Sequence, residues 1–149
     1  MRAVVQKVSR AKVSVDGQTI GQIEKGFLVL LGVYKEDTDK DLDYIYKKVT
    51  GLRVFEDEND QMNLALNDVG GELLVVSQFT LYGDARKGRR PSFTDAAKGD
   101  LAKSLYEDFI TRAKADGFNC KSGEFGAHME VELVNDGPVT ILLDSFKNF

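Results

Sequence analysis

Two short runs of consecutive apolar residues limit the fold of this 149-residue chain more than any other feature. The first is Phe27-Leu28-Val29-Leu30-Leu31-Gly32-Val33, and the second is Leu73-Leu74-Val75-Val76, which is followed by Ser77. A strand with apolar side chains on both faces is stable only when both faces are covered. The two runs therefore predict buried strands in a domain built of layers.

The other strand signals are short or alternating. Near the N-terminus they predict strands over residues 4–8, 11–15 and 19–23. Asp16-Gly17 is typical of the two-residue turn that joins the last two strands as a hairpin. A further strand is predicted over residues 52–55, and it leads into the acidic segment 56–60, which we expect to be a solvated turn.

Two segments have helical periodicity. In the first, Leu42, Ile45, Tyr46 and Val49 recur at helical spacing. Thr38 and Asp41 precede it as a capping box, and we expect the helix to end near Gly51. The second is predicted over residues 100–116, with Gly117 at its C-terminal cap. Two helices among many strands, without a linker or repeat, predict one α+β layered domain over residues 1–149.

Composition excludes several classes of protein. No apolar run approaches the roughly 18 residues that cross a membrane, and the charged, alternating N-terminus is unlike a signal peptide. The single cysteine, Cys120, cannot form an internal disulfide, so we expect a cytoplasmic protein and a packing role for this thiol. The net charge of −4 argues against broad binding to DNA or other duplexes. This charge still permits a local basic patch, and the candidate residues are Arg86, Lys87, Arg89 and Arg90. The alternative is that these four residues form a solvated loop with no binding role.

The chain lacks the residues of the common catalytic sites. His128 is the only histidine, and a Ser77/His128 or Thr80/His128 dyad is possible, but nothing else in the sequence supports one. One histidine and one cysteine do not suffice for a zinc site, and no Walker or GxGxxG loop is present. Calcium binding by the acidic segment 56–60 is a weaker alternative to a turn. We therefore predict no metal and no cofactor.

Two segments that this reasoning leaves unexplained resemble the signature motifs of the D-aminoacyl-tRNA deacylase family. One is Ser77-Gln78-Phe79-Thr80-Leu81-Tyr82-Gly83-Asp84, at the end of a predicted strand. The other is Asn135-Asp136-Gly137-Pro138-Val139-Thr140, a turn between two predicted strands. Phe125-Gly126-Ala127-His128-Met129 and the basic loop 86–93 resemble further family segments. The resemblance runs from Met1 to about Ser145, and it implies three layers (sheet, sheet and helix) in an obligate homodimer.

The resemblance implies hydrolysis of the ester bond in D-aminoacyl-tRNA and in tRNA mischarged with glycine. Ser77, Gln78, Phe79 and Thr80 would line the pocket around this ester, and backbone N–H groups would stabilise the oxyanion. Water would be activated with help from the 2′-hydroxyl of the 3′-terminal adenosine. Thr80 has no evident base, so we expect it not to be the nucleophile.

The resemblance also implies how L-amino acids are rejected. Gly137 and Pro138 would form a cis peptide bond that enters the partner subunit's pocket, where its carbonyl groups bind the α-amino group of the substrate and exclude an L side chain. Met129 would line this pocket. Most members have arginine where this chain has Lys7, which cannot form the bidentate contact that braces the loop. Two alternatives stay open: a catalytically silent dimer that binds the tRNA 3′ end, and a small-molecule esterase that uses Ser77.

Overall fold

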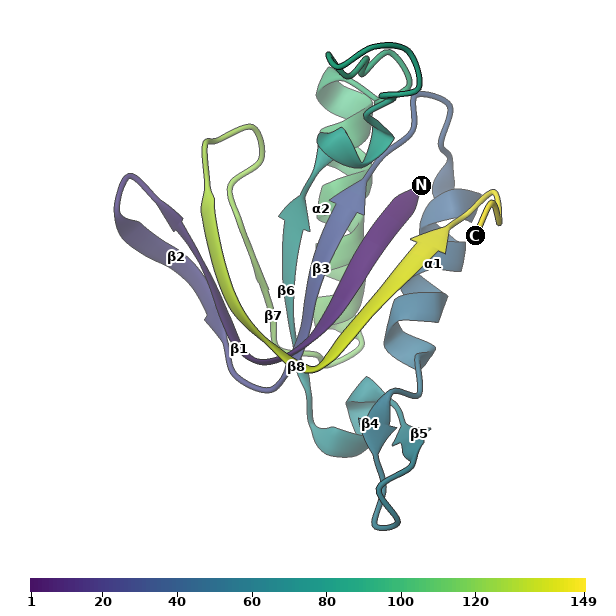
Figure 1. The fold of residues 1–149 in the computed structure, drawn as a ribbon. Helices are drawn as coiled ribbons and strands as arrows, with labels where there is room; N and C mark the ends of the chain where they lie inside the picture. Colours follow the sequence, from purple (N-terminus) through teal and green to yellow (C-terminus); the bar gives the residue numbers. More distant parts are fainter.

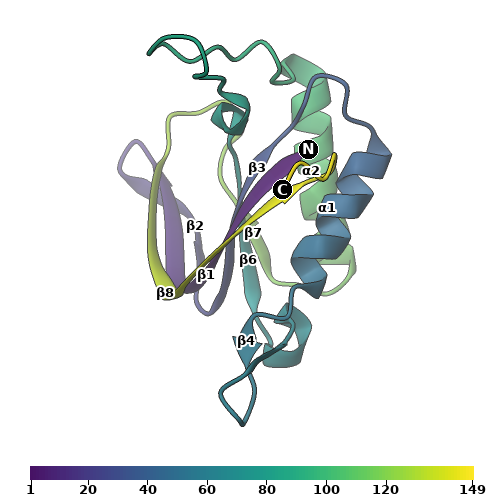
Figure 2. The same ribbon diagram turned by 45° about the vertical axis from the view of Figure 1, so that its right-hand side comes forward.

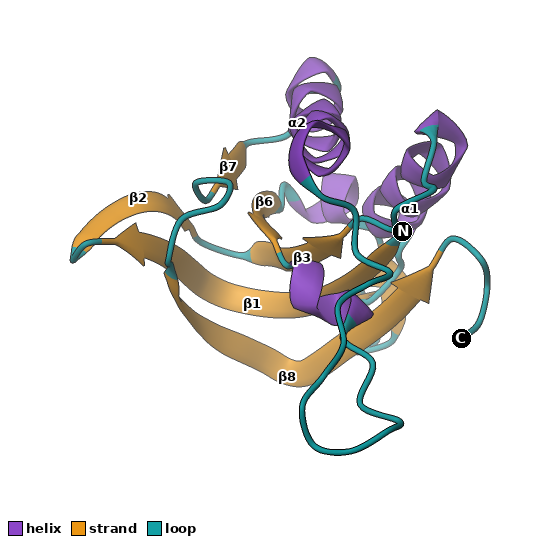
Figure 3. Cartoon of the chain, turned by 90° about the horizontal axis from the view of Figure 1, so that it is seen from above, coloured by secondary structure: helices purple, strands orange, loops and turns teal.

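The computed structural model describes all 149 residues as a curved sheet with two helices on one side. Helices α1 (Asp39–Gly51) and α2 (Gly99–Ala115) cover the same face of β3 (Gly26–Gly32) and β6 (Glu72–Ser77), as Figures 1 and 3 show. The long strands β1 (Arg2–Val15) and β8 (Glu130–Asp144) curve away from the helices on the other side. This is the α+β layered arrangement that the sequence predicts.

The strand order in the main sheet is β2-β1-β3-β6-β7, with β8 paired to the other edge of β1. Strand β2 is Gln18–Ile23, and β7 is the short strand Cys120–Ser122. The pairs β3–β6 and β6–β7 are parallel, and the pairs of β1 with β2, β3 and β8 are antiparallel. Parallel neighbours need crossover connections, and α1 and α2 supply them on the same face (Figure 2).

Buried apolar side chains form two clusters, one on each side of the sheet. The larger cluster lies under the helices and includes Phe27, Val29, Leu73 and Val75. The smaller one includes Leu28 and Leu74, from the opposite face of the same two strands. Because β3 and β6 bury both faces, their apolar runs are continuous, as the sequence analysis expects.

The first helix begins as predicted. The Thr38 side chain accepts a hydrogen bond from the Lys40 N–H, and the Asp41 carboxylate accepts one from the Thr38 N–H at 2.9 Å. The second helix ends before Gly117, whose φ of +91° is the left-handed conformation that suits glycine. Neither helix is long and apolar enough to cross a membrane.

Three strand predictions need correction. Residues 4–8 and 11–15 belong to one strand, β1, which bends at the exposed residues Ser9 and Arg10. The strands on either side of Gly137-Pro138 are likewise one strand, β8, whose pairing with β1 is irregular at the same level. The strand predicted over residues 52–55 is wrong, since only Phe55–Glu56 (β4) pairs, with β5 (Met62–Leu64).

Candidate active site

A pocket of about 520 Å³ lies at the carboxyl end of β6. It brings together three segments that are far apart in the sequence: the end of β6, the start of α2 and the segment before β8. Its lining includes Ser77, Gln78, Phe79, His128 and Met129. Four of the residues predicted for the substrate pocket thus lie around one cavity, while Thr80 is not part of its lining.

The backbone beside this pocket offers unused hydrogen-bond donors. Strand β6 ends at Ser77, and after Gln78 the chain forms the 3₁₀ helix η2 (Phe79–Tyr82). The Gln78 N–H donates to the Leu31 carbonyl at 2.8 Å, which holds the segment against the end of β3. The first N–H groups of a helix have no partner within the helix. In η2 these are the N–H groups of Phe79 and Thr80, and no turn or cap hydrogen bond uses them. Such a pair of adjacent N–H groups can stabilise an oxyanion.

No side chain in the pocket is set up as an activated nucleophile. The Thr80 hydroxyl accepts a hydrogen bond from the Gln78 side-chain amide. His128 is exposed at the pocket and makes no hydrogen bond to Ser77 or to Thr80, although Ser77 lines the same cavity. The two dyads that the sequence leaves open are therefore not formed.

Sequence reasoning missed the apolar wall contributed by the loop before α2. Phe93 packs against Phe79 with ring centroids 5.2 Å apart in an edge-to-face arrangement. Ala96, Ala97 and the backbone of Gly99 continue this wall to the first turn of α2. No pattern in the sequence marks these residues, because they face the pocket only after the chain has folded back across β6.

The predicted basic residues lie on a loop beside this pocket. Asp84 and Ser92 exchange backbone hydrogen bonds of 2.7 and 2.9 Å, which close the loop. The Arg86 guanidinium bonds the Asp84 carboxylate at 2.7 Å and lowers the pKa of Asp84 to about 2, so this pair is neutral overall. Lys87 and Arg90 line an adjoining hollow together with Arg86, while Arg89 is exposed outside it. These residues form a compact cationic surface with few acidic partners.

The Gly137-Pro138 segment lies at the bend of β8, and its peptide bond is cis. The Asn135 side chain holds the bend: its carbonyl oxygen accepts from the Val139 N–H at 3.2 Å, and its amide donates to the Thr140 hydroxyl at 3.1 Å. The role of Asn135 was missed, although asparagine is a common residue in such turns. Both Gly137 and Pro138 are exposed.

This segment does not reach the pocket of its own chain. It lies opposite Lys7 on β1, between the pairs Gln6–Thr140 and Val8–Asn135. Across the sheet, Lys7 pairs with Phe27 of β3, and Phe27 pairs with Leu73 of β6. The pocket begins at Ser77, four residues beyond Leu73 along β6. At about 3.3 Å per residue, that offset alone is about 13 Å. Figure 1 shows the bend of β8 and the helix η2 at opposite ends of the sheet.

Lys7 is buried, with 2% of its surface exposed, and it does not hydrogen-bond to the Gly137-Pro138 segment. Its ammonium group pairs instead with the Glu56 carboxylate at 3.2 Å and lies 5.5 Å from the centre of the Phe55 ring. Within one chain, Lys7 thus makes no bracing contact with this segment.

Two other predicted features have structural roles. Burial raises the pKa of the Cys120 thiol to about 11, which fits a packing residue and not a reactive thiolate. In the acidic segment, the Asp57 carboxylate accepts hydrogen bonds from the N–H groups of Asn59 and Gln61 at 2.8 and 3.1 Å. These bonds make the segment a closed turn.

Comparisons with known proteins identify the family of the chain. Residues 4–144 match the family described as D-Tyr-tRNA(Tyr) deacylase. The chain is 65% identical to the D-aminoacyl-tRNA deacylase of Clostridioides difficile and 60% identical to that of Thermosipho africanus, in both cases over the full length of both proteins. The solved structure of a c-Myc DNA unwinding element binding protein is 42% identical, with a TM-score of 0.91 over 97% of this chain and 98% of that one. A probable eukaryotic D-amino acid tRNA deacylase, 19% identical, shares the fold with a TM-score of 0.78 over 96% and 98% of the two chains.

Proposed function

The chain belongs to the D-Tyr-tRNA(Tyr) deacylase family, and we propose that it hydrolyses the ester bond between a D-amino acid and tRNA. The observation that carries this proposal is the pocket at the end of β6, with Ser77, Gln78 and Phe79 beside two unused backbone donors. An aminoacyl ester is already activated, so its hydrolysis needs positioning and charge stabilisation more than a strong nucleophile. The substrate implies a cytoplasmic enzyme.

The reaction follows from these donors. A water oxygen attacks the ester carbonyl carbon, and the N–H groups of Phe79 and Thr80 stabilise the negative charge that develops on the carbonyl oxygen. The bond between this carbon and the ribose oxygen then breaks, and the ribose oxygen takes up a proton. The free 2′-hydroxyl of the terminal adenosine helps to activate the water. The products are a free amino acid and tRNA.

Selection against L-amino acids requires a second copy of the chain. Within one chain, the Gly137-Pro138 segment lies about 13 Å or more from the pocket along the sheet. In a two-fold dimer, each exposed segment can instead enter the other subunit's pocket. There its carbonyl groups bind the α-amino group and leave no room for an L side chain, so that D-amino acids and glycine are accepted.

The surface of the chain supports such a dimer. Val134 and Leu142, on either side of the bend in β8, are 38% and 53% exposed. The smaller apolar cluster is incompletely covered, because Met129 and Val131 at its edge are only partly buried. Apolar side chains on both arms of one strand are typical of a face that a partner subunit covers.

The basic loop completes the substrate site. Arg86, Lys87, Arg89 and Arg90 would contact phosphates near the 3′ end of tRNA, since the loop adjoins the pocket. The net charge of −4 gives no support for binding of an extended duplex. We therefore favour recognition of the tRNA end, and not of DNA.

Incubation with D-Tyr-tRNA and L-Tyr-tRNA tests the proposed function. We expect release of tyrosine from the D ester and not from the L ester, measured as free amino acid. A protein that binds the tRNA 3′ end without releasing tyrosine would be the silent dimer. Covalent labelling of Ser77 by a serine-reactive phosphonate, with loss of activity, would identify the esterase instead.

Thr80→Ala should retain substantial activity, with a loss of about tenfold or less in kcat. The hydroxyl of Thr80 bonds Gln78 and is not part of the pocket lining, whereas the backbone donors persist in the variant. Single-turnover hydrolysis of D-Tyr-tRNA measures this step directly. A loss of about 10⁴-fold with an intact fold would show that Thr80 is the nucleophile.

A further inference from the structure

A second cavity, of about 610 Å³, lies at the other end of η2 from the candidate active site. Phe79, the first residue of η2, lines the active-site pocket, and Tyr82, the last, lines the second cavity. At about 2.0 Å per residue, these positions are separated by about 6 Å along the 3₁₀ helix. This spacing is comparable with one or two stacking steps of about 3.4 Å in a nucleic acid strand.

The cavity has aromatic and cationic walls. The Tyr34 ring lies between Tyr82, at 5.6 Å, and Phe146, at 5.3 Å in an edge-to-face arrangement. The Arg2 guanidinium stacks over the Tyr82 ring, 4.6 Å from its centre. Phe146 is 51% exposed, so its ring is accessible to a ligand. Exposed aromatic rings beside arginine are the components with which proteins bind single-stranded nucleic acid.

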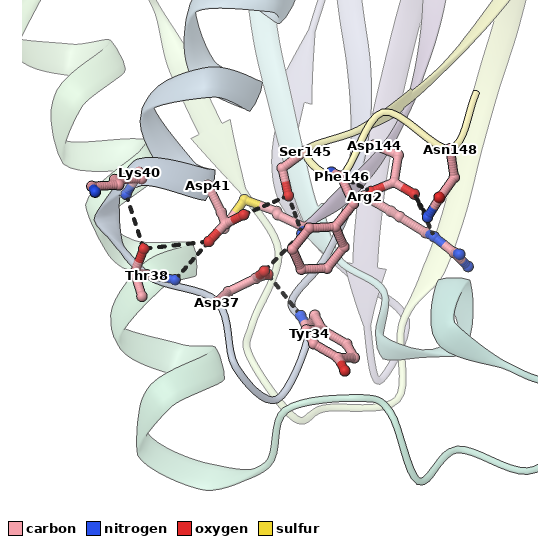
Figure 4. Close-up of polar contacts among 11 residues, drawn as sticks. Arg2, Tyr34, Asp37, Thr38, Lys40, Asp41, Asp144, Ser145, Phe146 and Asn148 are labelled. Atoms are coloured by element: carbon pink, nitrogen blue, oxygen red, sulfur yellow. Dashed lines mark hydrogen bonds and ion pairs between the residues drawn. The ribbon is translucent and has the colours of Figure 1, made fainter.

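A hydrogen-bond network fixes the position of Phe146. The Asp144 carboxylate accepts from the Phe146 N–H and from the Asn148 side chain, each at 2.9 Å. Ser145 donates to the Asp41 carboxylate at 2.7 Å, at the start of α1. Figure 4 shows the Phe146 ring and Tyr34 near each other, below these contacts. A ligand that stacks on Phe146 would therefore not have to order this segment first.

The cations available to a phosphate lie next to the cavity. Within it, Asp84 is paired with Arg86 and Asp95 with Lys35 at 3.1 Å, whereas Lys87 and Arg90 of the adjoining basic hollow form no ion pair. Arg86 also faces the adjoining basic hollow. The buried Tyr82 hydroxyl in the wall has no hydrogen-bond partner, although buried polar groups normally have one. Arg2 Nε also lacks a hydrogen bond but lies 3.6 Å from the Asp144 carboxylate, with which it forms an ion pair.

We propose that this cavity is a second subsite, which binds the nucleotide before the aminoacylated adenosine in the single-stranded 3′ end of tRNA. The base stacks on the exposed Phe146 ring, which the edge-to-face contact with Tyr34 supports, and the phosphate between the two nucleotides lies toward the basic hollow that includes Lys87 and Arg90. The proposal rests on the proposed function, since it extends the RNA strand from the active-site pocket across η2. A free aminoacyl-adenosine lacks the preceding nucleotide and would not make the contact with Phe146.

The test compares two substrates of different length. Phe146→Ala should lower kcat/KM on D-Tyr-tRNA about 5- to 100-fold more than kcat/KM on D-tyrosyl-adenosine, because a lost base–aromatic stack has an effect of this size. Phe146→Trp keeps a stacking surface, so the ratio of kcat/KM on D-Tyr-tRNA to kcat/KM on D-tyrosyl-adenosine should return close to its wild-type value. Met62→Ala removes an equally exposed apolar side chain from β5 and should leave the ratio unchanged. An equal loss on both substrates, or no loss on tRNA, would overturn the proposal.

A binding measurement separates this proposal from the proposed function. The anisotropy of a labelled, non-acylated RNA that ends in CCA should report weaker binding by Phe146→Ala than by the wild-type protein. If the wild-type protein hydrolyses neither ester, the proposed function fails, yet Phe146-dependent binding of this RNA would still support the subsite. Equal binding of this RNA by the two proteins would refute it, whatever the outcome of the hydrolysis assay.

Discussion

Gly137→Ala should lower kcat/KM on D-aminoacyl-tRNA by about 10²-fold, or allow measurable hydrolysis of L-aminoacyl-tRNA. Gly137 has a φ of +127°, which L-residues rarely adopt. A Cβ there would lie 2.7 Å from Val139 Cγ2 and 3.1 Å from the Val139 nitrogen. Val139 is buried and held by Asn135, so the strain has to be relieved by moving the bend. A shift of about 1 Å in a group that positions the substrate costs about this much in rate.

Gly70→Ala is the matched control for this variant. Gly70 also has a positive φ, of +63°, but a Cβ there would contact nothing within 4 Å, and the residue lies at the end of η1 (Leu66–Val69), away from the pocket. The control should show the stability cost of alanine in this conformation without the loss of activity. A Gly137→Ala enzyme with wild-type rate and wild-type D-over-L preference would show that the bend does not select the substrate.

The pocket could be predicted from the sequence in part. The polar residues after the apolar run stand out because the strand leaves the core at Ser77, but the assignment of Ser77, Gln78 and Phe79 to the pocket came from the resemblance to a family. The prediction that Met129 lines the pocket also came from this resemblance. The strand-like alternation that includes Met129 did not indicate it. Phe93 and the start of α2 could not be predicted, since they reach the pocket through a loop whose path is set by tertiary packing.

The continuity of β1 is a second feature that the sequence hides. Ala3 and Val5 belong to the apolar cluster under the helices, whereas Ala11 and Val13 belong to the cluster on the other face. All four have odd numbers, so in a regular strand they would lie on one face. The bend and the irregular pairing around Val8 reverse the face. This reversal interrupts the alternation, and one strand therefore resembles two.

The partner of Lys7 is a feature that the sequence does not reveal. Lys7 has the same parity as Ala3 and Val5, and its aliphatic stem is therefore buried on the helix side of β1. Its ammonium group leaves the core at β4, where Glu56 neutralises it. Alternation places the side chain on the correct face, but it cannot predict a partner from a turn 49 residues away.

Gly32→Val should lower kcat on D-aminoacyl-tRNA by about 10²-fold or more. A Cβ at Gly32 would lie 3.0 Å from the Gln78 carbonyl oxygen and 3.0 Å from Leu81 Cβ, and the branched side chain of valine adds further atoms. The backbone of η2 would have to move, and with it the N–H groups of Phe79 and Thr80. Loss of one such donor typically costs 10²- to 10³-fold in kcat. Gly51→Val serves as the control, because a Cβ at Gly51 would have no atom within 4 Å. The kcat of this variant should be close to the wild-type value.

The two glycine variants together test whether each active site is shared between subunits. A Gly137→Ala subunit keeps an intact pocket, and a Gly32→Val subunit keeps an intact bend in β8. If the bend enters the partner's pocket, a mixed dimer contains one complete site out of two. Random mixing by unfolding and refolding should then restore about a quarter of wild-type activity, since about half of the dimers are mixed.

If both elements act within one chain, or if the protein works as a monomer, every site in the mixture carries a defect and mixing restores nothing. Sedimentation of the mixture verifies that dimers have formed, so that a failure to recover activity would refute the shared site.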